Sequence, residues 1–292
     1  MANTQDIRRR IKSIRNTSQI TKALQMVAAS KMRKAQMAAI AGRPYSNLMN
    51  RVLVSLQQRT DSKLHPLLQV REVKRELVVI LSTDKGLAGP LNTNLFREAV
   101  KFEADKTIYV TSGAKARQFI VRTRRELVAD FPLKDAPAFT ETKEISKFCV
   151  EKFLNGEVDK VSVLYTHFIN TINQKPVVQT LLPIERFDLP EASVAGASPD
   201  GSGDPMLGYE FEPTPEAVLD IMLPYYLHYQ IYQMVLDARA SEHSSRMVAM
   251  KNATDNAKQF IKDLTLEYNK MRQASITTEL LEIATAQMAL GG

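Results

Sequence analysis

The chain has 292 residues, of which 44% are hydrophobic and 24% are charged. These values are ordinary for a globular protein and leave room for one large domain or two small ones. No run approaches the roughly 20 apolar residues that a membrane span needs. The basic residues 8–10 lead into no apolar stretch either, so we expect no signal peptide. A single cysteine, Cys149, excludes an internal disulfide and a cysteine-based zinc site. Because Cys149 lies inside a predicted helix, we expect it to be a buried, inert thiol.

Positive charge is concentrated at the start of the chain. The net charge is +7, and residues 1–60 carry twelve Lys and Arg residues against one acid, Asp6. Such a stripe predicts an acidic partner, and the charges leave nucleic acid, an anionic membrane and an acidic protein surface open. A solvated helix face without a partner is a further interpretation of the same pattern.

The first predicted element is one long helix over residues 4–57. Heptad positions a and d are apolar or small almost throughout, which is typical of a coiled coil. The a series is Ile7, Ile14, Thr21, Ala28, Ala35, Gly42, Met49 and Leu56, and the d series is Ile11, Ser18, Gln25, Met32, Ala39, Ser46 and Leu53. At 1.5 Å per residue this helix would span roughly 80 Å, which is too long for a compact domain. We expect Pro44 to bend it.

The middle of the chain, residues 75–187, changes period. Apolar runs predict strands at 77–81, 107–111, 161–165 and 176–182, and the segments 92–104, 114–121 and 140–154 between them have helical patterns. Strands that alternate with helices indicate an α/β unit with a mostly parallel sheet. Residues 190–208 are rich in Pro, Gly, Ser, Ala and Asp, and are therefore expected to form a flexible loop.

The last predicted element is a second long helix over residues 214–289. Thr214 is its expected N-cap, Pro215 its first residue, and Pro224 an expected kink. Apolar and small residues recur at alternating steps of four and three along this helix. The register of this spacing then drifts, and it resumes at Phe260, Leu264 and Met271. The regular part is Leu227, Ile231, Met234, Ala238, Ser241, Ser245 and Val248.

These elements predict an α/β protein with a long antiparallel coiled coil. The N- and C-terminal helices pair, and a central Rossmann-like α/β domain with a mostly parallel sheet lies at one end of the pair. The expected parts are an N-terminal coiled-coil helix at 1–60, the α/β domain at 75–188, a flexible loop and foot at 189–212, and a C-terminal coiled-coil helix at 213–292.

Catalytic signatures are missing from this sequence. The turn at residues 82–89 resembles a phosphate-binding turn but lacks both G-x-G-x-x-G and the P-loop pattern, so a structural turn is the favoured interpretation. Asp84 and Lys85 are expected to be a surface pair rather than a catalytic one. No nucleophile elbow is present, and the four histidines fall at no metal-ligand spacing. We therefore expect no catalytic residue, no cofactor and no metal.

Five segments carry a family resemblance that extends in order over the whole chain. They are residues 20–34 (ITKALQMVAASKMRK), 81–92 (LSTDKGLAGPLN), 168–171 with Gln174 and Pro176, 240–257 (ASEHSSRMVAMKNATDNA) and 272–280 (RQASITTEL). Together they resemble the gamma subunits of F-type ATP synthases. Ala88 stands where the family often has cysteine and Pro90 where it often has glycine, and no cysteine-pair insert of the chloroplast type is present, so thiol regulation is not expected.

The resemblance implies a rotating central shaft inside a ring of three alpha and three beta subunits. It couples proton flow through a membrane ring of c subunits to ATP synthesis or hydrolysis, has no catalytic site of its own, and also binds an epsilon subunit. The basic stripe would then face acidic lever segments of the beta subunits. A bacterial plasma membrane fits a sequence in which we expect no transit peptide, so the expected location is the cytoplasmic face of that membrane, without a span.

The resemblance also implies site residues. Lys22, Leu24 and Met26 map to the stretch that faces the beta levers, although packing of the two apolar side chains within the shaft stays open. Three residues map to a C-terminal contact with a beta loop, and three to the foot beside the c ring and epsilon. These two sets are Arg272, Gln273 and Thr277, and Tyr209, Phe211 and Glu212.

Two other functions compete with this one. A coiled-coil adaptor that binds nucleic acid through the basic stripe would lose affinity steeply with salt. A nucleotide-binding enzyme built on the α/β domain would bind or turn over nucleotide by itself. The resemblance favours the shaft over both, and implies that nucleic acid is not a partner.

Overall fold

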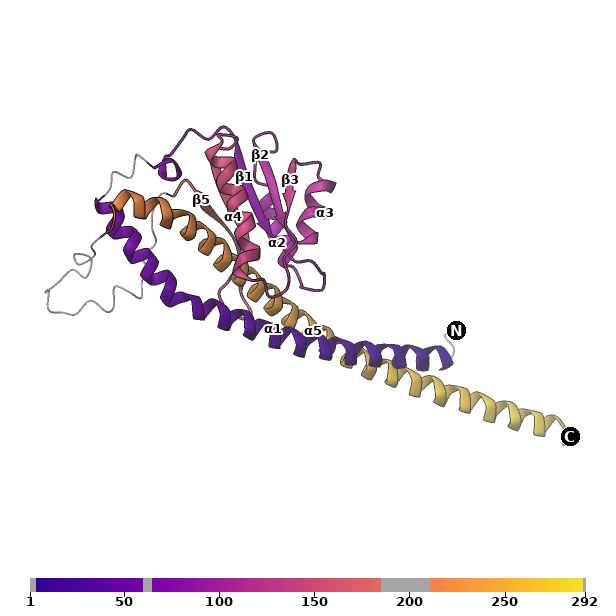
Figure 1. Ribbon diagram of the computed structural model, residues 1–292. Helices are drawn as coiled ribbons and strands as arrows, with labels where there is room; N and C mark the ends of the chain where they lie inside the picture. Colours follow the sequence, from indigo (N-terminus) through magenta and orange to yellow (C-terminus); the bar gives the residue numbers. More distant parts are fainter. Residues whose placement is uncertain (1–3, 60–64, 185–210, 291–292) are drawn as a thin grey trace. The chain divides into compact units, whose positions relative to one another are not determined.

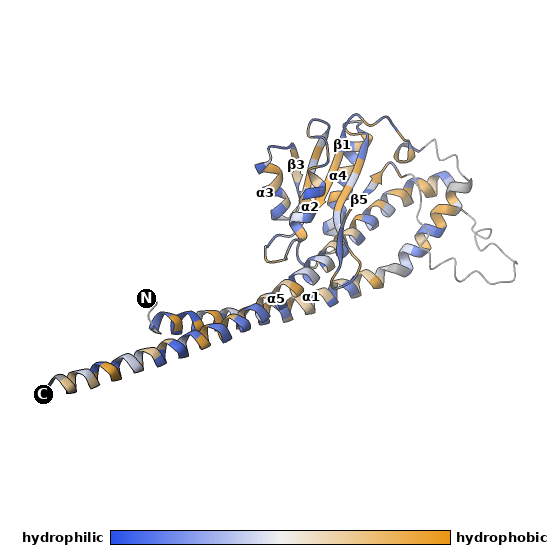
Figure 2. Cartoon of the chain, turned by 180° about the vertical axis from the view of Figure 1, so that it is seen from behind, coloured by the Kyte–Doolittle hydropathy of each residue, from blue (hydrophilic) through white to orange (hydrophobic). Residues whose placement is uncertain are grey.

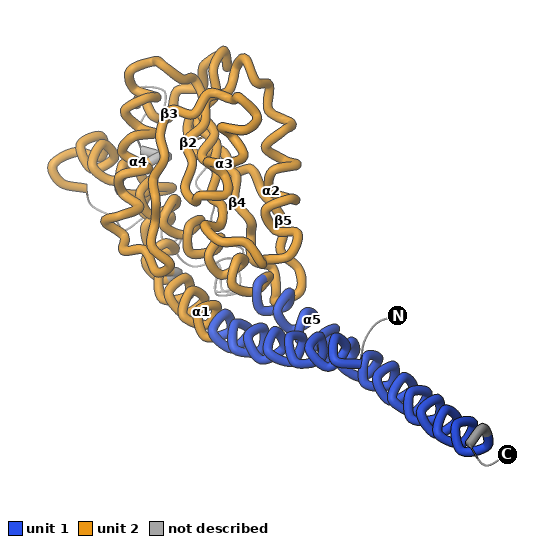
Figure 3. The backbone as a smooth tube through the Cα atoms, turned by 90° about the vertical axis from the view of Figure 1, so that its right-hand side faces the viewer, with its two compact units in different colours: residues 1–29, 246–292 blue, residues 30–245 orange. Residues whose placement is uncertain are grey.

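The structure, a computed structural model, describes residues 4–59, 65–184 and 211–290. The loop predicted at 190–208 lies outside these residues. Two long helices, α1 (Thr4–Arg59) and α5 (Pro215–Leu290), stand at the two ends of the chain order, and an α/β segment lies between them in sequence (Figure 1). The chain divides into two compact units (Figure 3): unit 1 contains residues 1–29 and 246–292, and unit 2 contains residues 30–245.

Unit 1 is an antiparallel pair formed by the first part of α1 and the last part of α5. Arg8 donates a hydrogen bond to the hydroxyl of Tyr268 at 2.7 Å, and the Thr21 and Thr254 hydroxyls lie 2.7 Å apart, so residue numbers rise on one helix as they fall on the other. The prediction that the terminal helices pair is confirmed. Polar and apolar residues alternate along both helices, as an amphipathic pair requires (Figure 2).

The buried seam of unit 1 follows the predicted heptad on α1. The a positions Ile7, Thr21 and Ala28 are buried. On α5 the seam keeps steps of four and three through Met250, Thr254, Ala257, Ile261, Leu264, Tyr268 and Met271. The assignment of Phe260 to this seam was wrong: it is 60% exposed, because the contact face passes through Ala257 and Ile261 on either side of it.

Unit 2 is built on a five-stranded sheet in the order β3-β2-β1-β4-β5. The strands are β1 (Glu76–Leu81), β2 (Thr107–Ser112), β3 (Leu127–Asp130), β4 (Lys160–Phe168) and β5 (Gln174–Leu182). β1 pairs in parallel with β2 and β4, β2 pairs in parallel with β3, and only β5 is antiparallel, to β4. The prediction of a mostly parallel sheet is confirmed, but β3 was not predicted.

Helices cover both faces of this sheet. Because side chains alternate along a strand, Val78 and Ile80 of β1 pack with α2 (Leu91–Ala99) and α3 (Ala114–Arg122), while Leu77 and Val79 belong to the other face. That second core contains α4 (Phe139–Leu154) and the unit 2 parts of α1 and α5, with a short 3-10 helix η2 (Pro66–Leu68) at its side. Burial on both faces explains the continuous apolar run of β1.

Several local predictions can be compared with the structure. Thr214 caps α5, since its hydroxyl accepts a hydrogen bond from the amide of Ala217 at 3.3 Å. Pro44 lies inside α1 without ending it, and α1 curves over the half that belongs to unit 2 (Figure 1). The helix predicted over 92–104 ends at Ala99, where the Arg125 guanidinium donates to the Ala99 and Val100 carbonyls at 3.1 Å. Those carbonyls are among the ones a helix end leaves without partners.

Candidate functional site

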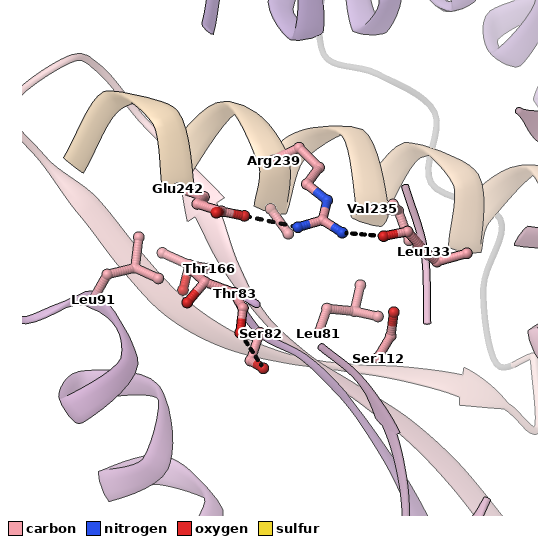
Figure 4. A pocket seen from close by; sticks show the side chains of 11 residues that line it. Leu81, Ser82, Thr83, Leu91, Ser112, Leu133, Thr166, Val235, Arg239 and Glu242 are labelled. Carbon is pink, nitrogen blue, oxygen red and sulfur yellow. Dashed lines mark hydrogen bonds and ion pairs between the residues drawn. The ribbon is translucent and has the colours of Figure 1, made fainter. Parts of the chain in front are cut away.

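The carboxyl edge of the parallel sheet is the first candidate site. Ligands of open α/β sheets bind outside the carboxyl ends of the strands, where the strand order reverses. Here that point lies between β1 and β4. The ends of these strands, with those of β2 and β3, line a small cavity (Figure 4) through Ser82, Ser112, Leu133 and Thr166.

Helix α5 fills this crevice. The Arg239 guanidinium enters from α5, donates to the Leu133 carbonyl at 3.0 Å and to a Glu242 carboxylate oxygen at 2.8 Å, and lies 3.6 Å from a carboxylate oxygen of Asp84. The side chains of Arg239 and Glu242 are only 6% and 7% exposed. The space that remains is about 10 Å³, enough for at most one water molecule. A nucleotide therefore does not fit in the crevice in this conformation.

The turn at residues 82–89 is held by its own hydrogen bonds. The Thr83 hydroxyl donates to the Lys85 carbonyl at 2.8 Å and accepts from the Asn92 amide at 2.7 Å. A carboxylate oxygen of Asp84 accepts from the Ala114 amide at 3.0 Å, so this acid serves the first turn of α3. These contacts support a structural turn rather than a phosphate-binding one.

The paired helices of unit 1 are the second candidate site, and their charge is the main evidence. Unit 1 carries twelve Lys and Arg residues against six Asp and Glu residues. Unit 2 carries 27 basic against 26 acidic residues, so nearly all of the net charge belongs to unit 1. Most of the net charge of unit 1 lies on α1, since residues 1–29 carry six basic residues against one acid, whereas residues 246–292 carry six against five. A basic rod of this kind fits an acidic surface.

The predicted contact residues on α1 are accessible. Lys22 is exposed, and Leu24 and Met26 are 37% and 61% exposed, together with the neighbouring Ile20 and Val27. Leu24 and Met26 thus lie outside the buried seam of the shaft, which passes through Thr21 and Ala28. Apolar side chains that stay exposed beside cations are suited to a partner surface.

The predicted residues on α5 lie where the pair becomes a single helix. The contacts of Arg8 with Tyr268 and of Thr21 with Thr254 place Thr4, the first described residue of α1, near Arg272. Every described side chain from Arg272 to Met288 is exposed, including Gln273 and Thr277. The Thr277 hydroxyl donates to the Gln273 carbonyl of its own helix at 2.9 Å. The end of α5 continues beyond the start of α1 (Figure 1).

Apolar side chains on this single helix are exposed to an unusual degree. Five of them are between 47% and 80% exposed: Ile276, Leu280, Leu281, Ile283 and Met288. A lone helix of this length is marginal in water, and exposed apolar residues in such number mark an interaction surface.

The three predicted foot residues are only partly described. Tyr209 lies outside the described residues. Phe211 is half-buried and packs against the core of unit 2, while Glu212 is exposed.

Neither a metal-ligand cluster nor a membrane-spanning helix is found in the described part of the chain. No group of three or more His, Cys, Asp or Glu side chains there is arranged to hold a metal ion. Among the same residues, no helix combines the length and the apolar character that crossing a bilayer requires. Burial raises the pKa of the Cys149 thiol to about 12, which agrees with the predicted buried, inert cysteine.

Sequence reasoning missed Arg239 and Glu242 as a buried pair. The signal was present: they stand three residues apart on α5, next to Val235 and Ala238, at positions where the helix turns toward a core. A charge on such a face predicts a buried ion pair, because an unpaired buried charge is too costly. The acceptor Leu133 carbonyl lies 106 residues away and left no local trace.

Known proteins that this chain resembles in sequence are described as ATP synthase components. The sequence family described as ATP synthase matches residues 3–290. The ATP synthase gamma chain of Methylacidiphilum infernorum is 50% identical over 296 residues, covering 100% of both chains. That of Opitutus terrae is 50% identical over 292 residues, covering 99% of each.

Solved structures show the same fold. A chain in the central stalk and c-ring structure of the Tetrahymena thermophila mitochondrial ATP synthase has a TM-score of 0.60 and 25% identity, over 80% of this chain and 99% of that one. A chain of the Euglena gracilis enzyme reaches a TM-score of 0.67 at 19% identity, over 98% and 94%. The full-length identity to the bacterial relatives decides the assignment: this chain belongs to the ATP synthase gamma chain family.

Proposed function

We propose that this chain is the rotating central stalk of a proton-translocating F-type ATP synthase, a non-catalytic subunit that couples proton flow to ATP synthesis or hydrolysis. The observation that carries the proposal is unit 1: a long, basic, antiparallel helix pair that ends in a single helix with exposed apolar residues. The solved Tetrahymena relative belongs to a central stalk, which supports the same role.

The proposed partners of unit 1 are three alpha and three beta subunits arranged in a ring. An acidic lever on each beta subunit would meet the basic surface that contains Lys22, and the apolar side chains of Leu24 and Met26 would pack against it. Arg272, Gln273 and Thr277 would contact a beta loop at the point where α5 continues alone. The ring would also cover the exposed apolar residues 276–288.

Coupling follows from the asymmetry of such a stalk. A single helix pair presents a different face to each of three beta subunits. It therefore stabilises each beta subunit in a state with a different affinity for nucleotide. A stalk changes these affinities only through differential contacts, and the same contacts let nucleotide binding turn the stalk. This chain therefore needs surface chemistry and stiffness rather than an active site.

The other proposed partners are the c ring and an epsilon subunit. Glu212 is exposed and the half-buried Phe211 packs against the core of unit 2, so the residues just before α5 offer a supported surface for the foot, to which we also assign Tyr209. In this proposal the parts of the chain are the coiled-coil helices 1–60 and 213–292, the α/β domain 75–188, and the loop and foot 189–212.

The proposed location is the cytoplasmic face of a bacterial plasma membrane. The support comes from the relatives, since the chains of Methylacidiphilum infernorum and Opitutus terrae are bacterial and match over the full length. Attachment would be peripheral, through the c ring.

ATP hydrolysis by matched alpha and beta subunits, with and without this purified chain, tests the proposal. We expect the chain alone to be inactive, to co-migrate with both partners, and to raise turnover when added. Failure to co-assemble and to change turnover would contradict the assignment, and salt-dependent binding to free RNA or DNA would then become the next measurement.

A further inference from the structure

Seven consecutive residues of α5, residues 239–245, form a dense polar contact inside unit 2; we call them the joint segment. Three of its serines donate hydrogen bonds to backbone carbonyls of the α/β part: Ser241 to Thr166 at 2.8 Å, Ser244 to Thr171 at 2.9 Å, and Ser245 to Ala88 at 2.7 Å. Each acceptor belongs to a different structural feature, namely strand β4, the β4–β5 hairpin and the turn after β1.

Charged groups reinforce these bonds on the same segment. Arg239 donates to the Leu133 carbonyl at 3.0 Å, and the Nε2 atom of His243 lies 3.2 Å from a carboxylate oxygen of Asp135. Asp135 also accepts from Lys31 of α1. Burial opposes ionisation of Asp135, but the hydrogen bond from Lys31 and the charge of His243 lower its pKa. The segment is therefore attached to the loops after β1 and β3, to β4 and to the β4–β5 hairpin.

The serines of the joint segment differ from the threonines of α5. Thr254, Thr265, Thr277, Thr278 and Thr285 all donate to carbonyls of their own helix. Ser241, Ser244 and Ser245 donate across to the α/β part instead, and their residues are buried. Serine is only a moderate helix former, so three of them within five residues do not serve the helix itself.

The type of contact has a mechanical consequence. Apolar contacts are non-directional, so an apolar helix face can turn against a core with little change in buried area. Hydrogen bonds depend on distance and angle, and weaken steeply when donor and acceptor rotate apart. Acceptors on several elements therefore fix the rotation of α5 about its own axis relative to the sheet.

We propose that residues 239–245 are the torsional joint that locks the α/β part to α5 and passes torque between the foot and the shaft. The inference rests on the proposed rotor function, because only a rotor loads this contact. Arg239 and the three serines act as positioning residues, since none of them meets nucleotide. The crevice at which other α/β folds bind a ligand is here occupied by the chain's own helix.

The test is the triple variant Ser241→Ala/Ser244→Ala/Ser245→Ala in the complete synthase, in membrane vesicles. Alanine removes the hydroxyls and preserves the helix. The matched control is Thr17→Ala/Thr123→Ala/Thr265→Ala, which removes three exposed hydroxyls that bond only within their own helices. ATP hydrolysis and ATP-driven proton pumping are measured on the same vesicles, with and without an uncoupler.

Each lost hydrogen bond makes local opening of the contact between the joint segment and the α/β part roughly 2- to 10-fold more frequent. The ratio of proton pumping to ATP hydrolysis should therefore fall at least about twofold in the triple variant. Hydrolysis in the presence of uncoupler, when the rotor carries no load, should stay at the control level. A purely structural role would instead lower assembly and both activities together. A triple variant that pumps like the control would overturn the proposal.

Two further outcomes are failed assembly of the triple variant and failure of the unmodified chain to support pumping, and each has its own interpretation. If the triple variant fails to assemble, the single variant Ser244→Ala is measured in the same way, and an unchanged pumping ratio in it would overturn the joint. If the unmodified chain fails to restore pumping to membranes that lack their own stalk, the rotor function is wrong, and the joint's mechanical role falls with it.

Discussion

The hydroxyl oxygens of Thr21 on α1 and Thr254 on α5 lie 2.7 Å apart in the buried seam of unit 1. Each hydroxyl also lies within bonding distance of a carbonyl of its own helix, Ser18 at 3.1 Å and Met250 at 2.8 Å. A buried polar pair in a coiled coil favours one register, because a shift of either helix breaks the contact between the two hydroxyls and places a hydroxyl against an apolar side chain. The pair therefore sets how the two helices align.

Valine has nearly the shape of threonine, so Thr21→Val and Thr254→Val test this pair. Each single variant should lower the free energy of unfolding by about 1 kcal/mol, because it removes the contact that the other hydroxyl makes across the seam. The double variant should lose less than the sum, with a coupling of about 0.5–1 kcal/mol. Chemical unfolding of the purified chain measures this, with Thr17→Val as an exposed control; strictly additive losses would contradict the coupling.

Gly113, between β2 and α3, offers a stability test in unit 2. Its φ of +114° is a conformation that side chains disfavour, and a Cβ there would overlap the carbonyl oxygen of Ser82. Gly113→Ala should therefore cost at least about 2 kcal/mol of folding free energy. Gly86→Ala is the control, since a Cβ there would meet open space; equal melting temperatures for the two variants would show that the turn tolerates the side chain.

Cys149 should not react with a thiol reagent in the folded chain. The thiolate is the reactive form, and burial raises the pKa of this thiol to about 12. Because the folded pKa lies above the unfolded one, the thiol's contribution to stability is full below pH 9 and is lost as the pH rises toward 12. Colour development with an aromatic disulfide reagent should be absent at pH 8 and appear on unfolding, whereas Ala104→Cys, in an exposed turn, should react at once.

The proposed beta contact predicts a loss of coupling without a loss of fold. Arg272→Ala and Thr277→Ala change exposed residues, so the melting temperature should not move. A truncated interface contact costs about 1 kcal/mol, so ATP synthesis in membrane vesicles should fall roughly fivefold. Lys262→Ala and Thr265→Ala are matched controls on the paired stretch of α5, and wild-type synthesis in both test variants would rule out this contact.

Much of the fold could be predicted because its signals are local and long. The heptad pattern of α1 persists over many residues, and the cap at Thr214 is followed directly by its helix. Strand β1 is marked by a continuous apolar run. Strand β3 has four residues, Leu127–Asp130, at the edge of the sheet, and their partial burial leaves neither an alternating nor a continuous pattern. Phe260 was misplaced because a small shift in helical register moves a residue out of the seam.

The contacts that join α5 to the sheet could not be predicted. Ser241 and Ser245 fall on the periodic face of α5, so the sequence indicated that they face a neighbour but not which one. Their acceptors are backbone carbonyls 75 and 157 residues away, and any residue type supplies a carbonyl. The beta-contact residues are in the opposite situation, since they were proposed from the family resemblance and the structure shows only that they are exposed.

Rotation is the central claim, and observing it directly is the sharpest test. A gold particle would be attached through Ala104→Cys, with the buried Cys149 left unlabelled, to the chain assembled in a surface-fixed ring of matched alpha and beta subunits. On addition of ATP we predict sustained rotation in one direction that stops when ATP is removed. Particles that stay attached and only fluctuate, while the same rings hydrolyse ATP, would contradict the rotor account.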